Sequence, residues 1–150
     1  MRIFWTTHVK ICEKFKILAK YIKDMSSETP GIEAYIFVRE RISKYQLGID
    51  ITSKALKNKH IEVHTTLKYE DKDQSKYKSH FEIIYSSIVK IIGEIKDKNE
   101  LQKILLCDVQ KEIYPNLEKS LLDLLHNSGY RNIKFEKKVD FEDLYNQRFN

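Results

Sequence analysis

Hydrophobic and polar positions repeat along this chain with two different periods, and the period separates expected helices from expected strands. Apolar residues recur every three or four positions from residue 7 to 25, and again from a capping pattern at 71–74 to about residue 96. Both segments are therefore predicted to be amphipathic helices. Pro115 suits the first turn of a third helix, which Gly129 is expected to end in a left-handed conformation. A short fourth helix is predicted to begin at Asp140.

Three successive segments show the pattern of β-strands. Residues 32–38 are apolar at both alternating sets of positions, which predicts a strand covered on both faces. Residues 45–52 and 60–69 alternate apolar with polar side chains and are predicted to be half-buried strands. Short connections between the three predict an antiparallel meander. Residues 133–136 are a candidate final strand, while residues 101–109 fit either a helix or, as we prefer, a buried strand.

These elements predict the α+β class: one compact domain over residues 1–150, with a three-stranded antiparallel meander and one or two further strands packed against three to four helices. A chain of 150 residues, 41% hydrophobic and 33% charged, suits a single folded core. No apolar run reaches the roughly 18 residues of a membrane span, and the N-terminus lacks a signal-peptide pattern. Cys12 and Cys107 are expected to be reduced thiols, so we expect a cytoplasmic protein without membrane contact.

The positive charge of the chain is concentrated near its N-terminus. The formal net charge is +5, and residues 1–23 carry six basic side chains against one acidic side chain. On the predicted helix the lysines lie mostly opposite the apolar face, where they form a basic surface: Lys10, Lys14, Lys16, Lys20 and Lys23. Such a surface fits a protein partner with an acidic surface or, alternatively, nucleic acid. A solvated helix face explains the same charges without any partner.

The polar face of the 60–69 strand is the strongest candidate for chemistry. His60, Glu62 and His64 point to the same side with neighbours about 6.5–7 Å apart, and Thr66 and Lys68 continue the row. Two imidazoles and a carboxylate are ligands that suit a transition metal such as zinc. A charged strand face exposed to solvent explains the same alternation with no ligand at all.

Asp50 on the preceding strand offers a second possibility for this face. Together with Glu62 it would hold Mg²⁺, which activates water to cut a phosphodiester. The arrangement resembles the hairpin of metal-dependent nucleases, in which an acid is followed by Glu-x-Lys on the adjacent strand. His64 stands here where that family has the lysine. The resemblance implies an enzyme with Asp50 and Glu62 as its magnesium ligands.

The sequence His64-x-Thr66 resembles one half of the paired His-x-Thr/Ser motif of two-histidine phosphoesterases. The resemblance implies that His64 acts as a general acid or base and that Thr66 binds phosphate. A second such pair is missing, because lysine and glutamate stand at the hydroxyl position two residues after His8 and His80.

The other motifs favour binding over catalysis. The four glycines are dispersed and form no phosphate loop, and the sequence contains no CxxC, HExxH or GxSxG. Four tyrosines near element ends are of the residue type that anchors protein interfaces: Tyr45, Tyr69, Tyr114 and Tyr145. We therefore predict a small non-enzymatic binding protein of the inhibitor, immunity or accessory type, which uses the basic helix and the polar sheet face and needs no cofactor. The alternatives are a phosphodiester-cleaving enzyme that uses Mg or Zn at the 50–68 strand face, and a nucleic-acid-binding module.

Overall fold

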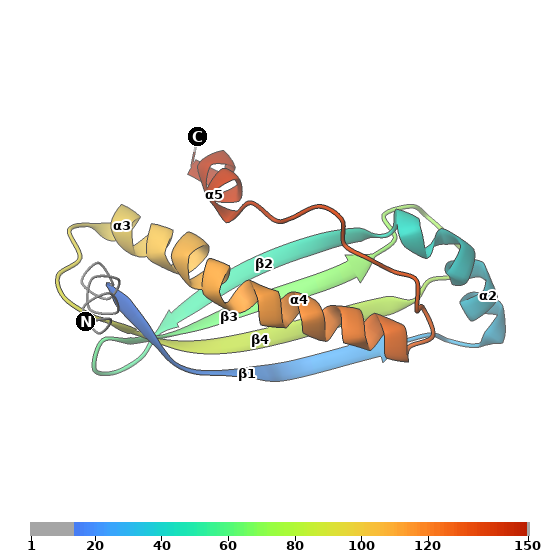
Figure 1. Cartoon of the computed structure of the whole chain (residues 1–150), viewed down its shortest axis with the longest axis horizontal. Coiled ribbons are helices and arrows are strands. Elements are labelled where there is room, and N and C mark those ends of the chain that lie inside the picture. Colours follow the sequence, from blue (N-terminus) through green and yellow to red (C-terminus); the bar gives the residue numbers. More distant parts are fainter. Residues whose placement is uncertain (1–13, 150) are drawn as a thin grey trace, which may run out of the picture.

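The computed structural model describes residues 14–149, which form a four-stranded antiparallel sheet with helices packed against it (Figure 1). The strands are β1 (Phe15–Glu28), β2 (Gln46–Ala55), β3 (His60–Glu70) and β4 (His80–Ile91). Their order in the sheet is β1-β4-β3-β2. β2, β3 and β4 therefore form an antiparallel meander, and β1 and β2 are the two edges of the sheet.

The helices are distributed at one end of the sheet and along one of its faces. α2 (Ile32–Arg41) and a 3-10 turn (Ile42–Lys44) connect β1 to β2. After β4 the chain forms one helical run: α3 (Lys98–Lys103), a π-helical turn (Ile104–Asp108) and α4 (Val109–Asn127). Residues 128–140 have no regular secondary structure and lead to α5 (Phe141–Phe149). No helix within residues 14–149 is both long and apolar enough to cross a membrane.

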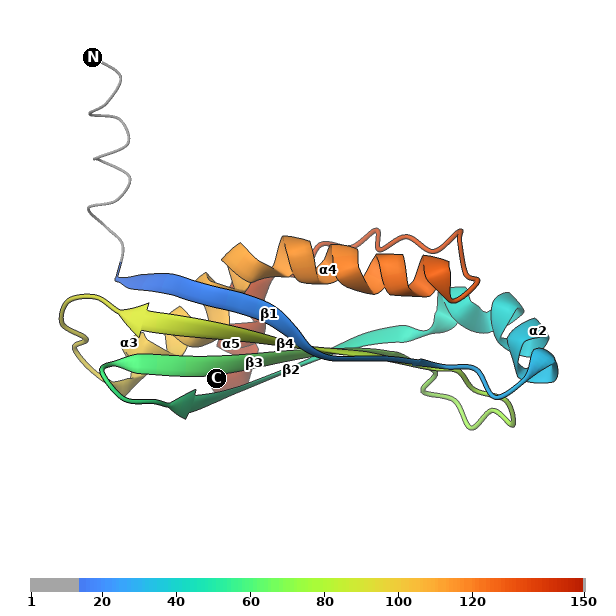
Figure 2. The ribbon, with the colours of Figure 1, turned by 90° about the horizontal axis from the view of Figure 1, so that it is seen from below.

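α4 lies along one face of the sheet, and the opposite face points away from it (Figure 2). We call this opposite face the open face. Every second side chain of β3 from Val63 to Tyr69 is buried on the α4 side, and β4 buries the same phase from Phe81 to Ile91. α4 packs against them with fully buried side chains four residues apart: Ile113, Leu117, Leu121 and Leu125. Because fully burying one such side chain stabilises a fold by roughly 1.5–3 kcal/mol, this layer holds the helix on the sheet.

Several predicted elements are confirmed. β2 and β3 coincide with the strands predicted over 45–52 and 60–69, and they pair directly with each other. α4 contains the helix predicted after Pro115, and α5 follows the predicted start at Asp140. The α+β class, with an antiparallel sheet packed against helices, is confirmed as well.

Gly129 ends α4 in the left-handed region, as predicted, with a φ of 104°. A Cβ atom at this position would lie 2.7 Å from the ring of Tyr35. The Tyr35 hydroxyl donates a hydrogen bond of 2.9 Å to the Gly129 carbonyl, so the ring packs directly on the glycine backbone. Both the backbone conformation and the close contact therefore require glycine here.

The helix predicted over residues 7–25 is wrong in the part that the structure describes, because residues 15–28 form β1. Residues 7–13 lie outside the described residues. The pairing of β1 with β4 shifts register at Leu18 and at Lys23. Each irregularity places side chains three residues apart, instead of two, on the same face of the strand. Two such shifts in one edge strand imitate the three-to-four-residue spacing of a helix.

The strand predicted over 32–38 is also wrong, because these residues belong to α2. α2 buries Ala34 and Val38, which are four residues apart, and leaves Ile32 and Ile36 exposed. A continuous apolar run fits a buried strand and a helix equally well, and the burial pattern decides for the helix. The third strand of the meander is therefore β4 and not residues 32–38.

The helix predicted up to residue 96 is wrong for a related reason, because residues 80–91 form β4. Ile84 and Ile88 lie on the open face, out of phase with the buried side chains of the same strand. They add apolar positions between the alternating core positions, and the combined spacing resembles that of a helix.

Residues 101–109 are helical, so the strand preferred for them is wrong and the helix alternative is confirmed. As a result α4 begins six residues before Pro115 instead of at it. Residues 133–136 do not join the sheet. They run along β2 without pairing with it, and this separation defines the site described next.

Candidate functional site

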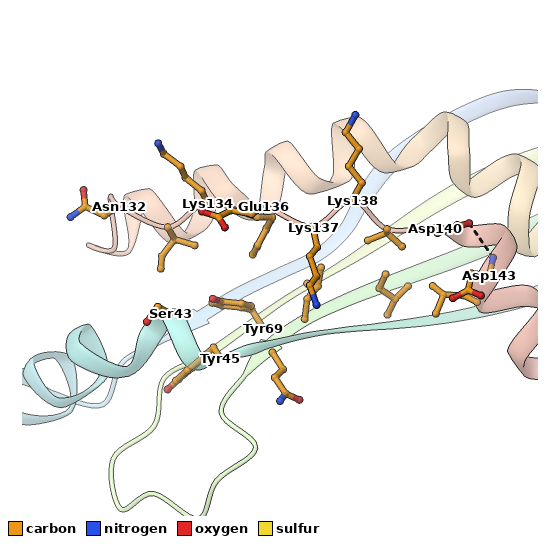
Figure 3. Close-up of a pocket in the computed structure, with 17 residues that line it drawn as sticks. Ser43, Tyr45, Tyr69, Asn132, Lys134, Glu136, Lys137, Lys138, Asp140 and Asp143 are labelled. Carbon is orange, nitrogen blue, oxygen red and sulfur yellow. Dashed lines mark hydrogen bonds between the residues drawn. The ribbon is translucent and has the colours of Figure 1, made fainter.

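A groove of about 1000 Å³ opens between the first half of β2 and segment 132–140, which has no regular secondary structure (Figure 3). β2 contributes Gln46, Leu47 and Ile49 to one wall. Segment 132–140 forms the opposite wall, and α5 adds Asp143 and Leu144 at one end. The groove therefore lies beside an edge of the sheet, where the outer backbone groups of β2 have no neighbouring strand within residues 14–149.

The floor of the groove is aromatic. The rings of Tyr45 and Tyr69 lie 5.6 Å apart, and Phe135 meets Tyr69 edge to face at 5.4 Å. Such tilted ring pairs stabilise by about 0.5–1.5 kcal/mol beyond the burial of their area. The floor is thus a packed surface and not a loose collection of side chains.

The hydroxyl groups of both tyrosines of the floor form hydrogen bonds within the protein. The Tyr69 hydroxyl donates to the Ile42 carbonyl at 2.8 Å, and the Tyr45 hydroxyl accepts from the Ser79 amide at 3.2 Å. Burial raises the pKa of both phenols, so they stay neutral over the physiological pH range. Their polar atoms already have partners, and the rings present an apolar surface to the groove.

Segment 132–140 follows the alternation of a strand although it pairs with no strand. Ile133 is buried, and Phe135 and Val139 are partly buried, whereas Lys134 and Lys138 are exposed. His126 Nε2 lies 3.2 Å from the Ile133 carbonyl oxygen, which tethers the segment to the end of α4. The apolar side chains of the segment therefore face the groove and the core.

This arrangement suits an extended polypeptide better than a compact ligand. An unpaired edge strand offers main-chain donors and acceptors to an added strand, and alternating apolar positions beside it accept alternate side chains. Aliphatic and aromatic side chains from both walls line the groove together with charged side chains of segment 132–140, and apolar positions with polar groups among them are typical of a binding site.

The residues predicted for catalysis lie on the open face, away from the groove. His64 Nε2 lies 3.4 Å from Glu62 Oε1, and the Ser86 hydroxyl donates to Glu62 Oε2 at 3.2 Å. Partial burial acts to raise the pKa of Glu62, but the hydrogen bond from Ser86 and the neighbouring His64 outweigh it and lower that pKa. Glu62 and His64 are thus brought together, as members of a polar network on the sheet surface.

Asp50 does not join this network. In the register of the sheet Asp50 stands opposite Thr66, whereas Glu62 stands opposite Lys54. The two carboxylates are therefore four positions apart along the strands, or about 13 Å, too far for a shared magnesium ion. Among residues 14–149 no group of three or more His, Cys, Asp or Glu side chains is placed to hold a metal ion. His64 and Thr66 share the open face two residues apart, and their role as a phosphoesterase pair stays a prediction.

The predicted basic helix is wrong, because its lysines lie on a strand. Lys10 is outside the described residues, and Lys14 forms an ion pair with Glu100. By register Lys16 stands opposite Lys90 on the open face, whereas Lys20 stands opposite Ser87 on the other face, and Lys23 lies at a register shift. The lysines are thus spread over both faces of β1 instead of forming one surface.

Sequence reasoning missed most of the groove and pointed only to two residues of its floor, Tyr45 and Tyr69. The alternation of Ile133 and Phe135 predicted a strand over residues 133–136, and Val139 extends the same alternation beyond the predicted strand. A segment with strand periodicity that lies outside the sheet is indistinguishable from a paired strand until the sheet order is known.

The family relationship follows from comparison with known proteins. The family model described as SecB, preprotein translocase subunit SecB, matches residues 9–150. The chain belongs to the SecB family. A candidate protein-export protein SecB of Pelagibacter ubique (strain HTCC1062) is 57% identical over 138 residues, which cover 92% of this chain and 99% of that protein.

More distant SecB proteins and a solved structure agree with this assignment. The protein-export protein SecB of Agrobacterium fabrum (strain C58 / ATCC 33970) is 24% identical over 92% of this chain and 84% of its own length. The SecB-like chaperone Rv1957 of Mycobacterium tuberculosis, solved with a ChAD peptide from the HigA1 antitoxin, has the same fold with a TM-score of 0.60 and 11% identity, covering 91% of this chain and 99% of that chain.

The predicted inhibitor or immunity function is therefore wrong. Membership in the SecB family makes this chain a relative of protein-export proteins and not of inhibitors. The broader expectation of a binding protein agrees with the family. The predicted basic helix is a strand over residues 15–28, and partner binding by its lysines stays a prediction.

Proposed function

We propose that this SecB-family protein is a protein-export chaperone that holds non-native preproteins by taking an extended segment into the groove beside β2. The observation that carries this proposal is a groove with an aromatic floor beside an edge of β2 that pairs with no other strand within residues 14–149. The family description supports preproteins as the substrate class. A chaperone of this kind would act in the cytoplasm, before its client is exported.

The two walls of the groove supply two different kinds of recognition. The outer edge of β2 offers hydrogen bonds to the main chain of a client, which are independent of the client's sequence. The apolar floor, with Tyr45 and Tyr69, favours side chains that a folded protein keeps inside its core. Together they select unfolded segments broadly and leave folded proteins unbound.

The length of the groove limits the size of the bound segment. The wall from residue 132 to 140 spans about 30 Å if it is extended at about 3.3 Å per residue. A client segment of about nine residues would therefore lie along it. Longer clients would contact the protein beyond this groove. Binding of an acidic protein partner or of nucleic acid to the rest of the surface stays an untested prediction.

The test uses two leucines of similar exposure. Leu144 lines the groove and is 43% exposed, whereas Leu56 is 41% exposed at the turn between β2 and β3, outside the groove. We expect Leu144→Asp to weaken binding of a fluorescently labelled, permanently unfolded polypeptide about tenfold, because it replaces apolar contact area with a charge. Leu56→Asp should bind like the natural chain. Fluorescence anisotropy measures both affinities.

A second readout follows the holding activity itself. The natural chain should suppress the light scattering of a protein that aggregates on dilution from denaturant, and Leu144→Asp should do so less well than Leu56→Asp. Equal losses in both variants, or no binding of the unfolded polypeptide by the natural chain, would refute the groove as the client site.

A further inference from the structure

Gln110 is a polar side chain in the core, at the start of α4 and directly after the π-helical turn. It is fully buried, and the hydroxyl of Thr65, equally buried on β3, donates to its Oε1 at 2.8 Å. Its Nε2 donates at 3.1 Å to the carbonyl of Leu105, which lies inside the π-helical turn. A buried amide is costly unless it is hydrogen-bonded, and here both its oxygen and its nitrogen have a partner. Gln110 therefore links the turn to the sheet.

The π-helical turn depends on a donor of this kind. In an α-helix the Val109 amide would donate to the Leu105 carbonyl, four residues earlier. Here the Val109 amide donates to the Ile104 carbonyl, five residues earlier, and the Gln110 side chain donates to Leu105 instead. A buried carbonyl that loses its donor costs free energy. Loss of the Gln110 amide should therefore favour a regular α-helix over the turn.

The turn determines which positions of the helical run face the same side. Asn99 on α3 and Lys111 on α4 are twelve positions apart, which in a regular α-helix separates them by about 120° around the axis. The turn accommodates one extra residue, so the separation falls to about 20°. The two positions therefore lie on nearly the same side of the run because the turn is present.

α5 is attached to the helical run on both sides of the turn. The Tyr145 hydroxyl donates to the Asn99 carbonyl on α3 at 3.3 Å. Lys111 on α4 forms an ion pair of 2.7 Å with Glu142 of α5. α5 also supplies Leu144 to one end of the groove. The geometry of the turn thus sets the position of α5, and with it that end of the groove.

We propose that Gln110 is a positioning residue for the client groove: through the π-helical turn it keeps α5 where Leu144 can contact a bound segment. This inference rests on the proposed function and goes beyond it, because Gln110 lies in the core and does not line the groove. If the turn became a regular helix, α3 would rotate by about 100° relative to α4. α5 could then keep only one of its two attachments.

The experiment compares two core variants of the full chain. Thr65→Val combined with Gln110→Met replaces both polar partners by apolar side chains of similar size, a change that leaves stability nearly unaltered. Because it removes the donor to Leu105, we expect its affinity for the labelled unfolded polypeptide to fall about fivefold. Thr65→Val alone keeps that donor but leaves the Gln110 oxygen without its partner. It should lower the urea midpoint and bind the polypeptide like the natural chain.

This dissociation of affinity from stability is the readout that distinguishes positioning from a purely structural role. Urea denaturation gives the stability of each variant, and fluorescence anisotropy gives its affinity. Leu144→Asp adds a second readout. It should cost about tenfold in affinity in the natural chain, and much less in the Thr65→Val/Gln110→Met background, where Leu144 is already displaced.

A surface variant tests the same connection if the double core variant does not fold. Lys111→Gln combined with Tyr145→Phe weakens the attachment of α5 on both sides of the turn and leaves the core unchanged. It should lower client affinity and reduce the effect of Leu144→Asp. Far-UV circular dichroism shows which variants keep the fold.

The outcomes separate this inference from the proposed function. Reduced affinity at nearly natural stability, together with a smaller effect of Leu144→Asp, supports the inference. Affinity that follows stability, or a full tenfold effect of Leu144→Asp in the folded variants, overturns it and leaves the groove as the client site. If the natural chain does not bind the unfolded polypeptide, or Leu144→Asp does not weaken its binding, the proposed function itself fails.

Discussion

The groove beside β2 and the open face of the sheet are formed by neighbouring parts of the same strands. They differ in whether their functional groups have partners within the protein. On the open face Glu62 accepts a hydrogen bond from Ser86 and lies 3.4 Å from His64 Nε2, so its carboxylate has neighbours within the protein. In the groove the apolar side chains and the outer edge of β2 are left for something else to cover. In the proposed client site the apolar side chains and the β2 edge thus lack an internal partner, whereas on the open face Glu62 belongs to a polar network.

The largest effect that separates the two regions is expected at the floor of the groove. Tyr69→Ala removes a ring that packs against Tyr45 and Phe135 and leaves a cavity in a site that is only 5% exposed. We expect the free energy of unfolding to fall by about 3–4 kcal/mol, measured by urea denaturation. Client affinity should fall as well, under conditions where the variant is still folded.

Tyr69→Phe is the control for this change. It keeps the ring and loses only the hydrogen bond to the Ile42 carbonyl, for a cost of about 1 kcal/mol. We expect unchanged client affinity. If Tyr69→Phe weakened binding as much as Tyr69→Ala, the hydroxyl and not the apolar floor would be the recognition element.

An intermediate effect is expected where α2 is attached next to the groove. Arg41 donates two hydrogen bonds to Asp71, at 3.1 and 3.2 Å, and the Asp73 amide and the Ser75 hydroxyl donate to the same carboxylate. The Arg41 guanidinium is the main reason that the pKa of Asp71 is lowered to about 2. We expect Asp71→Asn to lower the free energy of unfolding by about 2 kcal/mol at neutral pH.

The pH dependence of this change has a definite sign. A carboxyl whose pKa is lower in the folded chain stabilises the fold above its unfolded pKa, here 3.8, and this stabilisation disappears as the pH falls toward about 2. The difference between the natural chain and Asp71→Asn should therefore shrink between pH 4 and about pH 2 in urea titrations. Asp73→Asn is the control, since the Asp73 side chain is 77% exposed, and its effect should be smaller. A difference that persists at about pH 2 would contradict the charge-based explanation.

The smallest effect is expected on the open face. Glu62→Gln keeps the size of the side chain and removes the charge that faces His64. Because this pair is partly exposed, we expect only a small loss in the free energy of unfolding and no change in client affinity. Glu82→Gln, at the similar His80–Glu82 pair, should behave in the same way. A tenfold loss of client affinity in either variant would move the binding site to the open face.

Local sequence patterns were sufficient for the elements whose packing obeys one simple period. β3 and α4 each bury one regular set of positions, β2 packs Leu47, Ile49 and Ile51 partly buried against the core, and Gly129 is required by the backbone itself. These elements, and the α+β class that they imply, could be predicted because a two-residue or a 3.6-residue repeat has one interpretation when it is clean. Two aromatic residues of the groove floor, Tyr45 and Tyr69, were also visible as candidates for an interface.

Long-range contacts decided the rest. Register shifts gave β1 the spacing of a helix, isoleucines on the open face hid the alternation of β4, and one-sided burial made a helix of the apolar run in α2. Segment 132–140 has the alternation of a strand, yet β2 remains an edge because the segment stays apart from it. The period of a sequence pattern shows which side chains point to the same side of an element, but not which other segment packs against them. The groove exists because two segments some ninety residues apart in sequence face each other without pairing, and that is a property of the folded chain.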